Sequence, residues 1–321
     1  MLYYRLIALW VICEAFAGGI MHAFKIPFTG MLVSSLAVLC ITCLGFRFSG
    51  KGKILKAALL VCAFKFALSP HSPPTAYIAV LFQAAAGSLL FSLQRFKTTA
   101  AILLGMVALT ESALQRLLVL WVLYGKSFWN AVDQYVEKLS GNNSNGSATL
   151  TLAGIYIGLH FIVGILVGAF SASLAKRNFM LEAKYIIAWE DTTLPQRKKK
   201  RKKTKWIFII VWLLLLAIII FGYANPDKAM ISGGSALMIF FRAILIITAW
   251  YFFISPQVKR WLSKRWEHTR STQAEAYHQV TELIPSTFNL IKKSIHLSAS
   301  KKGLARIKLF IYIVLGNIFL E

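Results

Sequence analysis

The sequence is poor in charged residues, and acidic residues are the scarcest of them. Of its 321 residues, 15% are charged and 57% are hydrophobic, whereas soluble proteins are about 25% charged and about 45–50% apolar. The apolar residues also come in long runs rather than at the spacing of a surface helix or strand. The composition therefore excludes an ordinary soluble domain and indicates a chain whose solvent is the lipid bilayer.

The sequence also lacks the motifs of common catalytic and cofactor sites. It contains no GxSxG or HExxH motif and no paired-cysteine metal pattern, and its six histidines are scattered. The stretch "GFRFSGKG" at 45–52 approaches a phosphate-binding loop, but Gly52 stands where that loop needs Ser or Thr. We therefore expect no enzyme, no catalytic residues, no cofactor and no metal.

Cysteines are few, and all of them lie in apolar runs. They are Cys13, Cys40, Cys43 and Cys62. The CxxC spacing of the second and third is compatible with a dithiol in the membrane. The favoured interpretation is that all four are small buried hydrophobic side chains.

The main feature of the sequence is its long apolar runs. They lie at 4–24, 29–46, 54–69, 75–94, 99–124, 149–175, 206–223 and 235–254, and a short one follows at 304–320. A helix rises 1.5 Å per residue, so about 20 residues cross the hydrocarbon core. The sequence thus predicts an all-α, polytopic membrane helix bundle with about 8–9 transmembrane helices. In the last run, Arg306 and Lys308 leave only Leu309–Leu320 free of charge.

Positive charge alternates between the gaps that separate these runs. The formal net charge is +24, and most basic residues lie in the gaps after the second, fourth, sixth and eighth runs. By the positive-inside rule, this alternation predicts a cytoplasmic N-terminus. It also argues against nucleic acid as the partner. The first run is expected to be retained rather than cleaved as a signal peptide, because Glu14 precedes the cleavage-like stretch "AFAGG".

The charge pattern divides the chain into three expected parts. Residues 1–175 form a six-helix membrane domain, and residues 176–205 form a basic cytoplasmic linker containing "QRKKKRKKTKW". This linker is expected to lie on anionic lipid, and an acidic protein partner is the alternative. Residues 206–321 form a second membrane region with amphipathic cytoplasmic helices within 256–302. On the outer side, 126–148 is either a helix on the headgroups or a lid over a pocket.

Polar residues inside apolar runs are the strongest functional indicators, because burying them in lipid is costly. The ionisable residues of the first six runs are Glu14, Lys65, Glu111 and Arg116. Uncharged or titratable neighbours at similar depth are Gln83, Gln115 and His160. Two interpretations stay open: these residues line an interior cavity that binds a substrate, or they form interhelical salt bridges and hydrogen bonds that hold the bundle together.

Lys65 precedes a proline-rich turn in the stretch "FKFALSPHSPPTAY". Prolines in the 69–74 turn end one helix and begin the next. Lys65 could point its charge into the mouth of a cavity, where an anionic ligand would also meet the N-terminus of the next helix. The alternative is that its ammonium reaches up to the outer headgroups.

Small residues mark helix faces that can approach another helix closely. One patch, "EAFAGG", contains Ala15 and Gly19, and another contains Gly164 and Gly168. We expect them to pack against helices of this chain or of a partner subunit.

The first 175 or so residues resemble the substrate-binding S component of energy-coupling factor (ECF) vitamin transporters. The resemblance rests on six runs with the N-terminus inside, on "EAFAGG", and on "KFALSPHSPPTAYIAVLFQAAAGSLLF" in the third and fourth runs. The remainder is weakly similar to a shortened transmembrane T component. In that family, cytoplasmic coupling helices precede a final span, as 256–302 precedes 304–320 here.

The resemblance implies an uptake-transporter subunit in a bacterial cytoplasmic (inner) membrane. It would capture a small vitamin-like or cofactor-precursor molecule from outside, and partner ATPases would drive transport through a transmembrane coupling subunit. The "EAFAGG" patch would contact the partner membrane subunit. Lys65 would meet an anionic group of the substrate, and Arg116 would pair with Glu111 or Glu14. The whole expected substrate-binding set is Lys65, Glu14, Gln83, Glu111, Gln115 and His160.

Two other functions fit the same residues. A self-contained secondary transporter could carry protons on the glutamate, histidine and lysine side chains within the runs. A non-transporting membrane scaffold could use 176–205 and 256–302 to hold a partner.

Overall fold

The computed structural model describes most of the chain in separate stretches. They are residues 1–23, 28–48, 50, 52–69, 72, 74–92, 94–140, 148–189 and 255–320, with single positions between 210 and 249. The runs predicted at 206–223 and 235–254 lie almost entirely outside these residues, as does the second half of the linker at 176–205. The predictions for them stay predictions.

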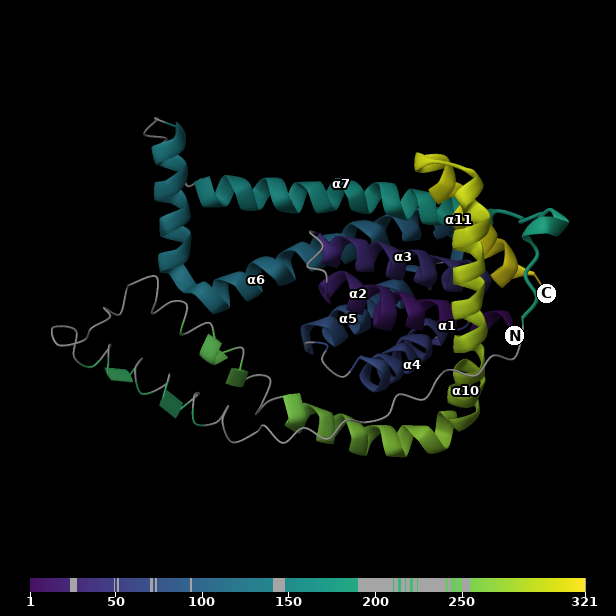
Figure 1. Ribbon diagram of the computed structural model, residues 1–321, viewed down its shortest axis with the longest axis horizontal. Coiled ribbons are helices and arrows are strands. Elements are labelled where there is room, and N and C mark those ends of the chain that lie inside the picture. Colours follow the sequence, from purple (N-terminus) through teal and green to yellow (C-terminus); the bar gives the residue numbers. More distant parts are fainter. Residues whose placement is uncertain are drawn as a thin grey trace. The chain divides into compact units, whose positions relative to one another are not determined.

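Every regular element among the described residues is a helix (Figure 1). The α-helices are α1 (Leu2–Ile12), α2 (Gly18–Ala23), α3 (Thr29–Arg47), α4 (Lys53–Leu68), α5 (Pro74–Leu90), α6 (Lys97–Ser140), α7 (Ala148–Lys176), α10 (Ser255–Leu297) and α11 (Gly303–Phe319). Short helical turns are η1 (Cys13–Ala17), η2 (Gln94–Phe96), η3 (Ala183–Tyr185) and η5 (Ser298–Ser300).

Three helical stretches in the described residues are long and apolar enough to cross a membrane. They are Thr29–Arg47, Lys97–Lys126 and Ala148–Lys176. The prediction of an all-α membrane protein is therefore confirmed, but these stretches are fewer than the eight or nine predicted. Helices α4, α5 and α11 have 16, 17 and 17 residues, so each is about 24–26 Å long, against about 30 Å for the hydrocarbon core.

The first apolar run is not one regular helix. Helix α1 passes into a π-helical turn, Cys13–Ala17, before α2 begins at Gly18. Such π-turns are rare and often occur at functional sites. The turn contains Glu14, the acid that the sequence places at membrane depth.

The chain forms two compact units that interleave along the sequence. The first contains Met1–Ala113, Gly158–Pro195 and Trp266–Glu321, and the second contains Leu114–Ile157 and Gln196–Arg265. These units do not coincide with the expected division at 175 and 206. Helices α6 and α7 contribute to both units, and α11 belongs to the first.

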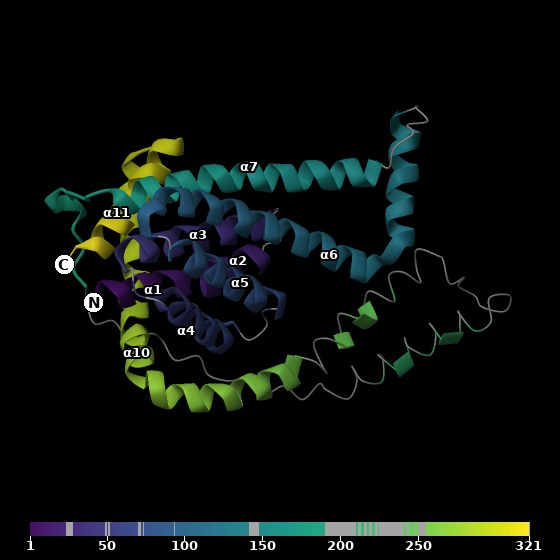
Figure 2. The same ribbon diagram turned by 180° about the vertical axis from the view of Figure 1, so that it is seen from behind.

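Helix α1 lies at the centre of the first unit, among α3, α4 and α11 (Figures 1 and 2). Every residue from Leu6 to Ile12 is buried. Helix α5 packs against α3 and α4, and glycines allow the close approach between α3 and α5. Added Cβ atoms would collide at Gly45 with Phe91 and at Gly87 with Ile41.

At one end of the first unit lie the helix ends that flank the basic gaps of the sequence. The Tyr3 hydroxyl donates to the Lys53 carbonyl oxygen over 2.7 Å, which joins the starts of α1 and α4. Lys97 Nζ donates to the Phe46 carbonyl oxygen over 3.0 Å, which joins the start of α6 to the end of α3. Helices α1, α4 and α6 therefore begin at the end of the unit where α3 ends, as the alternation of charge predicts. We call this the basic end.

Helix α11 is fixed at the basic end through one amide and two cations. The Asn317 side chain accepts a hydrogen bond from the Ile187 N–H (2.7 Å) and donates to the Tyr185 carbonyl oxygen (2.8 Å). The Arg5 guanidinium lies 4.4 Å from the centre of the Trp189 ring and donates to the carbonyl oxygen of Leu320. Arg47 lies over the Phe319 ring in the same way.

The amphipathic helix α10 packs its apolar side on the first unit itself. The Tyr277 ring stacks on Phe64 with centroids 4.4 Å apart, and Phe288 lies 5.7 Å from Phe16. From the sequence, this apolar face was predicted to lie on the inner membrane surface or against a partner. The sequence also predicted a break at Pro285, but α10 continues through Pro285, and the non-helical backbone lies at Gln273.

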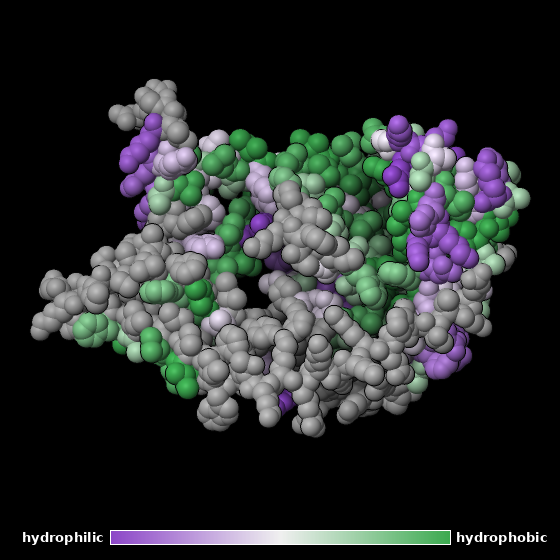
Figure 3. Space-filling view, viewed as in Figure 1, coloured by the Kyte–Doolittle hydropathy of each residue, from purple (hydrophilic) through white to green (hydrophobic). Residues whose placement is uncertain are grey.

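The outward face of α7 is strongly apolar (Figure 3). Within the first unit, its exposed large side chains are Leu159, Phe161, Ile162, Leu166 and Phe170. A wide apolar surface of this kind is what a lipid-facing helix presents.

In the second unit, α6 bends at Gly125, where φ is 69° and ψ is −170°. The helix then continues to Ser140. The Thr149 N–H donates to Asp133 over 2.6 Å, which joins the start of α7 to this part of α6. Residues 141–147 and the side chain of Phe128 lie outside the described part, so the two interpretations of 126–148 stay open.

The Gly164 contact with α6 generates a prediction about stability. A Cβ added at Gly164 would lie 2.5 Å from the Gly105 carbonyl oxygen, so α6 and α7 would have to separate. We expect Gly164→Ala to destabilise the protein by about 1–3 kcal/mol, as overpacking does. Thermal unfolding in detergent measures the change.

Gly158→Ala is the matched control, because a Cβ at Gly158 of the same helix meets open space. Alanine favours a helix over glycine by up to about 1 kcal/mol, so this variant should be neutral or more stable. Equal destabilisation of both variants would contradict the packing role of Gly164.

Candidate substrate-binding site

A buried ion pair joins the π-turn to the end of α4. Lys65 Nζ lies 2.7 Å from Glu14 Oε2, and the side chains are only 7% and 3% exposed. Lys65 therefore turns inward rather than toward headgroups, and its charge is already engaged by an acid. Arg116 was expected to pair with Glu111 or Glu14, and in the structure Lys65 pairs with Glu14.

Local backbone structure explains why the two groups meet. The π-turn holds Glu14 against α3 and α4, with which η1 is in contact. Lys65 lies in the last turn of α4, which ends where the Ser69 N–H bonds to the Lys65 carbonyl oxygen over 2.8 Å. A cation in this position is also favoured by the helix dipole.

Three thiols surround the ion pair. Cys40 lies beside Cys13, and Cys62 lies within electrostatic reach of both Lys65 and Glu14. All four cysteines are free, and three are fully buried in the apolar interior. The CxxC pair has not closed into a disulfide, and the thiols pack as small apolar groups beside the charges.

A second polar group lies near the start of α3. The Gln83 amide, on α5, donates to Ser34 Oγ over 3.0 Å, and Gln83 is only 2% exposed. The half-buried Glu111 of α6 lies beside the Gln83 side chain. Gln83 Oε1 and Glu111 Oε2 are buried and accept no hydrogen bond from the residues that the structure describes.

His160 and Ser112 lie against the same end of α3. The fully buried His160 ring lies 6.4 Å from the ring of Phe28, which precedes α3 in a left-handed conformation (φ 58°). A Cβ at Gly30 would lie 2.7 Å from Ser112 Oγ. Polar groups of α5, α6 and α7 thus gather at the N-terminal end of α3, where the helix dipole is positive. We call Ser34, Gln83, Glu111 and His160 the polar cluster.

The structure does not bring all the expected site residues together. Gln115 and Arg116 belong to the second unit, where Gln115 is half-buried and Arg116 is exposed. The sequence did not indicate Ser34, because an uncharged hydroxyl in an apolar run can face either lipid or the interior.

Among the small residues, Gly164 and Gly168 pack against the backbone of α6. The nearest atoms to a Cβ at Gly168 are backbone atoms of Ala101 and Ile102. Ala15 is buried within the π-turn. A Cβ at Gly19 would be 3.9 Å from Ser69 Oγ, an ordinary contact.

In the part of the chain that the structure describes, no three His, Cys, Asp or Glu side chains are grouped as metal ligands would be.

No family model matches the sequence, and no curated protein or solved structure matches it. The resemblance to ECF S components therefore stays a prediction, and a functional assignment has to be argued from the site.

The ion pair generates the next prediction. Lys65→Met leaves Glu14 charged in an apolar interior, so we expect a loss of about 3–5 kcal/mol in the free energy of unfolding. Glu14→Gln in the Lys65→Met background should recover much of the loss, because the uncompensated charge disappears. Unfolding in mixed micelles compares both variants with the wild type. A Lys65→Met variant as stable as the wild type would contradict this role of the ion pair.

Proposed function

We propose that this protein is a membrane uptake-transporter subunit that binds a small polar molecule, of the vitamin or cofactor-precursor class, in the polar cluster of its first unit. The proposal rests on the convergence of Ser34, Gln83, Glu111 and His160 from four helices. It includes the expected topology of about 8–9 spans with a cytoplasmic N-terminus in a bacterial cytoplasmic membrane.

The energetics of the cluster support binding over simple packing. A buried acceptor with no hydrogen-bond donor costs about 1–3 kcal/mol, and the bilayer offers no water to satisfy it. The oxygens Gln83 Oε1 and Glu111 Oε2 are two such acceptors within the described residues. A ligand with hydroxyl, amide or amine donors would remove this cost. Ligand binding therefore accounts for the two unsatisfied acceptors, which packing alone does not.

The position of the cluster fits capture from outside. Ser34 and Arg47 are separated by 13 residues of α3, which is about 20 Å along the helix axis. The cluster is therefore far from the basic end, which the positive-inside rule assigns to the cytoplasm. A solute arriving from the outer side would reach the cluster first.

The ion pair refines the class of substrate. Lys65 was expected to meet an anionic group, but Glu14 holds its ammonium at 2.7 Å. The acceptors of the polar cluster instead favour a neutral or cationic solute that donates hydrogen bonds. Partner ATPases and a coupling subunit would supply the energy, as the family resemblance implies.

Binding can be tested with the purified protein. We expect small molecules that co-purify to be detected by native mass spectrometry, and we expect Gln83→Leu to reduce their occupancy at least about tenfold, as the loss of one buried hydrogen bond to a charged or polar ligand implies. Gln279→Leu, the same change on α10, should leave occupancy unchanged. Equal occupancy in both variants would refute the cluster as the binding site.

A self-contained proton-coupled transporter is the second candidate. The observation that favours it is the presence of two carboxylates in the bundle, the buried Glu14 and the half-buried Glu111. Uptake into liposomes without any ATPase, abolished by Glu111→Gln, would establish this candidate. Uptake that requires a co-purifying ATPase would favour the first.

A further inference from the structure

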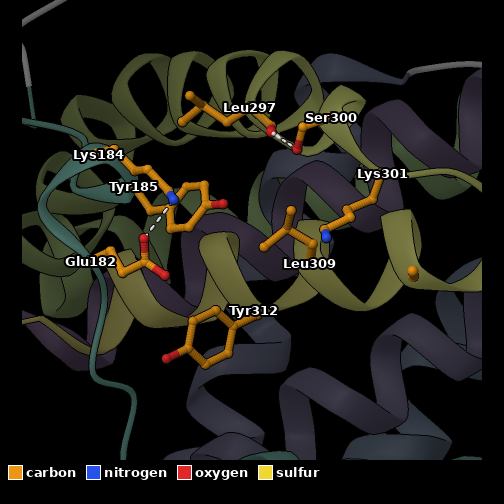
Figure 4. A pocket seen from close by; sticks show the side chains of 9 residues that line it. Glu182, Lys184, Tyr185, Leu297, Ser300, Lys301, Leu309 and Tyr312 are labelled. Atoms are coloured by element: carbon orange, nitrogen blue, oxygen red, sulfur yellow. Dashed lines mark hydrogen bonds and ion pairs between the residues drawn. The ribbon is translucent and has the colours of Figure 1, made fainter.

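A pocket of about 800 Å³ lies at the basic end, away from the polar cluster (Figure 4). It is an open pocket bordered by the segment after α7, the end of α10 and the first half of α11. The residues that line it are Glu182, Lys184, Tyr185, Leu297, Ser300, Lys301, Ala305, Leu309 and Tyr312.

The pocket carries positive charge on two sides. Lys301 and Lys184 approach it from opposite sides in Figure 4. Lys184 Nζ lies 2.6 Å from Glu182 Oε2, and this hydrogen bond and the charge of Glu182 raise the pKa of Lys184. Lys184 is therefore cationic at neutral pH, and Glu182 is the acid among the lining residues.

The surroundings strengthen this positive potential. The stretches 176–189 and 297–312 contain seven basic residues and one acidic residue. Hydrophilic residues gather at the end of the molecule where α10 and α11 lie (Figure 3). Helix α11 begins at Gly303 without a side-chain cap, so its first N–H groups add a partial positive charge beside Lys301.

The remaining lining is apolar or aromatic. Leu297 and Leu309 supply apolar surface, and Tyr312 is held by a hydrogen bond of 2.5 Å to the Met180 carbonyl oxygen. Arg177, at the end of α7, lies 4.9 Å from the centre of the Tyr312 ring. Tyrosines beside basic residues at a helix end are typical of the membrane–water interface.

We propose that this pocket binds the phosphate headgroup of an anionic phospholipid. Lys301 meets the phosphate beside the Lys184–Glu182 pair, and Leu297 and Leu309 meet the apolar part next to it. Basic pockets between helices on the cytoplasmic side of a membrane bind such headgroups. This is a discrete site, distinct from the diffuse attraction expected of 176–205, and it does not depend on the proposed transport function.

The experiment measures lipid retention by the full-length protein. The protein is exchanged into nanodiscs of phosphatidylcholine with a minor fraction of phosphatidylglycerol, and bound lipid is counted by native mass spectrometry after extraction. We expect phosphatidylglycerol to be retained preferentially. The double variant Lys184→Gln/Lys301→Gln should lower this preference at least about tenfold.

Lys56→Gln/Lys292→Gln is the matched control, since it removes two exposed lysines that do not line the pocket. It should keep the preference, and Lys301→Arg should keep it too, because the charge remains. Equal losses in both double variants would overturn the discrete site in favour of diffuse attraction. Displacement of the lipid by millimolar inorganic phosphate would overturn the lipid assignment and identify free phosphate as the ligand.

Discussion

The ion pair between Glu14 and Lys65 is the interaction on which the arrangement of the first unit depends. Each charge alone would cost several kcal/mol inside an apolar bundle. Together they require the π-turn after α1 and the last turn of α4 to meet at one depth. Because α1 is buried from Leu6 to Ile12 among α3, α4 and α11, the depth of this pair also sets how these helices pack around it.

The two ends of the first unit have different chemistry for a physical reason. Positive side chains can reach water at the basic end, where helix ends, cations and aromatic rings meet. A charged pocket therefore costs little desolvation energy there. The polar cluster lies about 20 Å away along α3, where each group must be satisfied by a neighbour or a ligand. The proposals for solute and lipid therefore concern separate regions and separate forces.

Much of the candidate site could be predicted from the sequence, because ionisable residues in apolar runs cannot face lipid cheaply. Glu14, Lys65, Gln83 and His160 are all buried as that rule requires. Their partners could not be predicted. The π-turn changes the direction of the residues after Ile12, and Gln115 lies in another unit although it is only one helical turn beyond Glu111.

The sequence by itself determined that this is a helical membrane protein, since long apolar runs leave the backbone no other way to satisfy its hydrogen bonds in lipid. It also determined the alternating direction of the helices, through the charges between the runs. Only the tertiary structure decided that Lys65 pairs with Glu14, that α10 and α11 join the first unit, and that Lys184 and Lys301 share a pocket. These contacts join residues far apart in the chain, and hydropathy and local charge carry no information about which distant side chains meet.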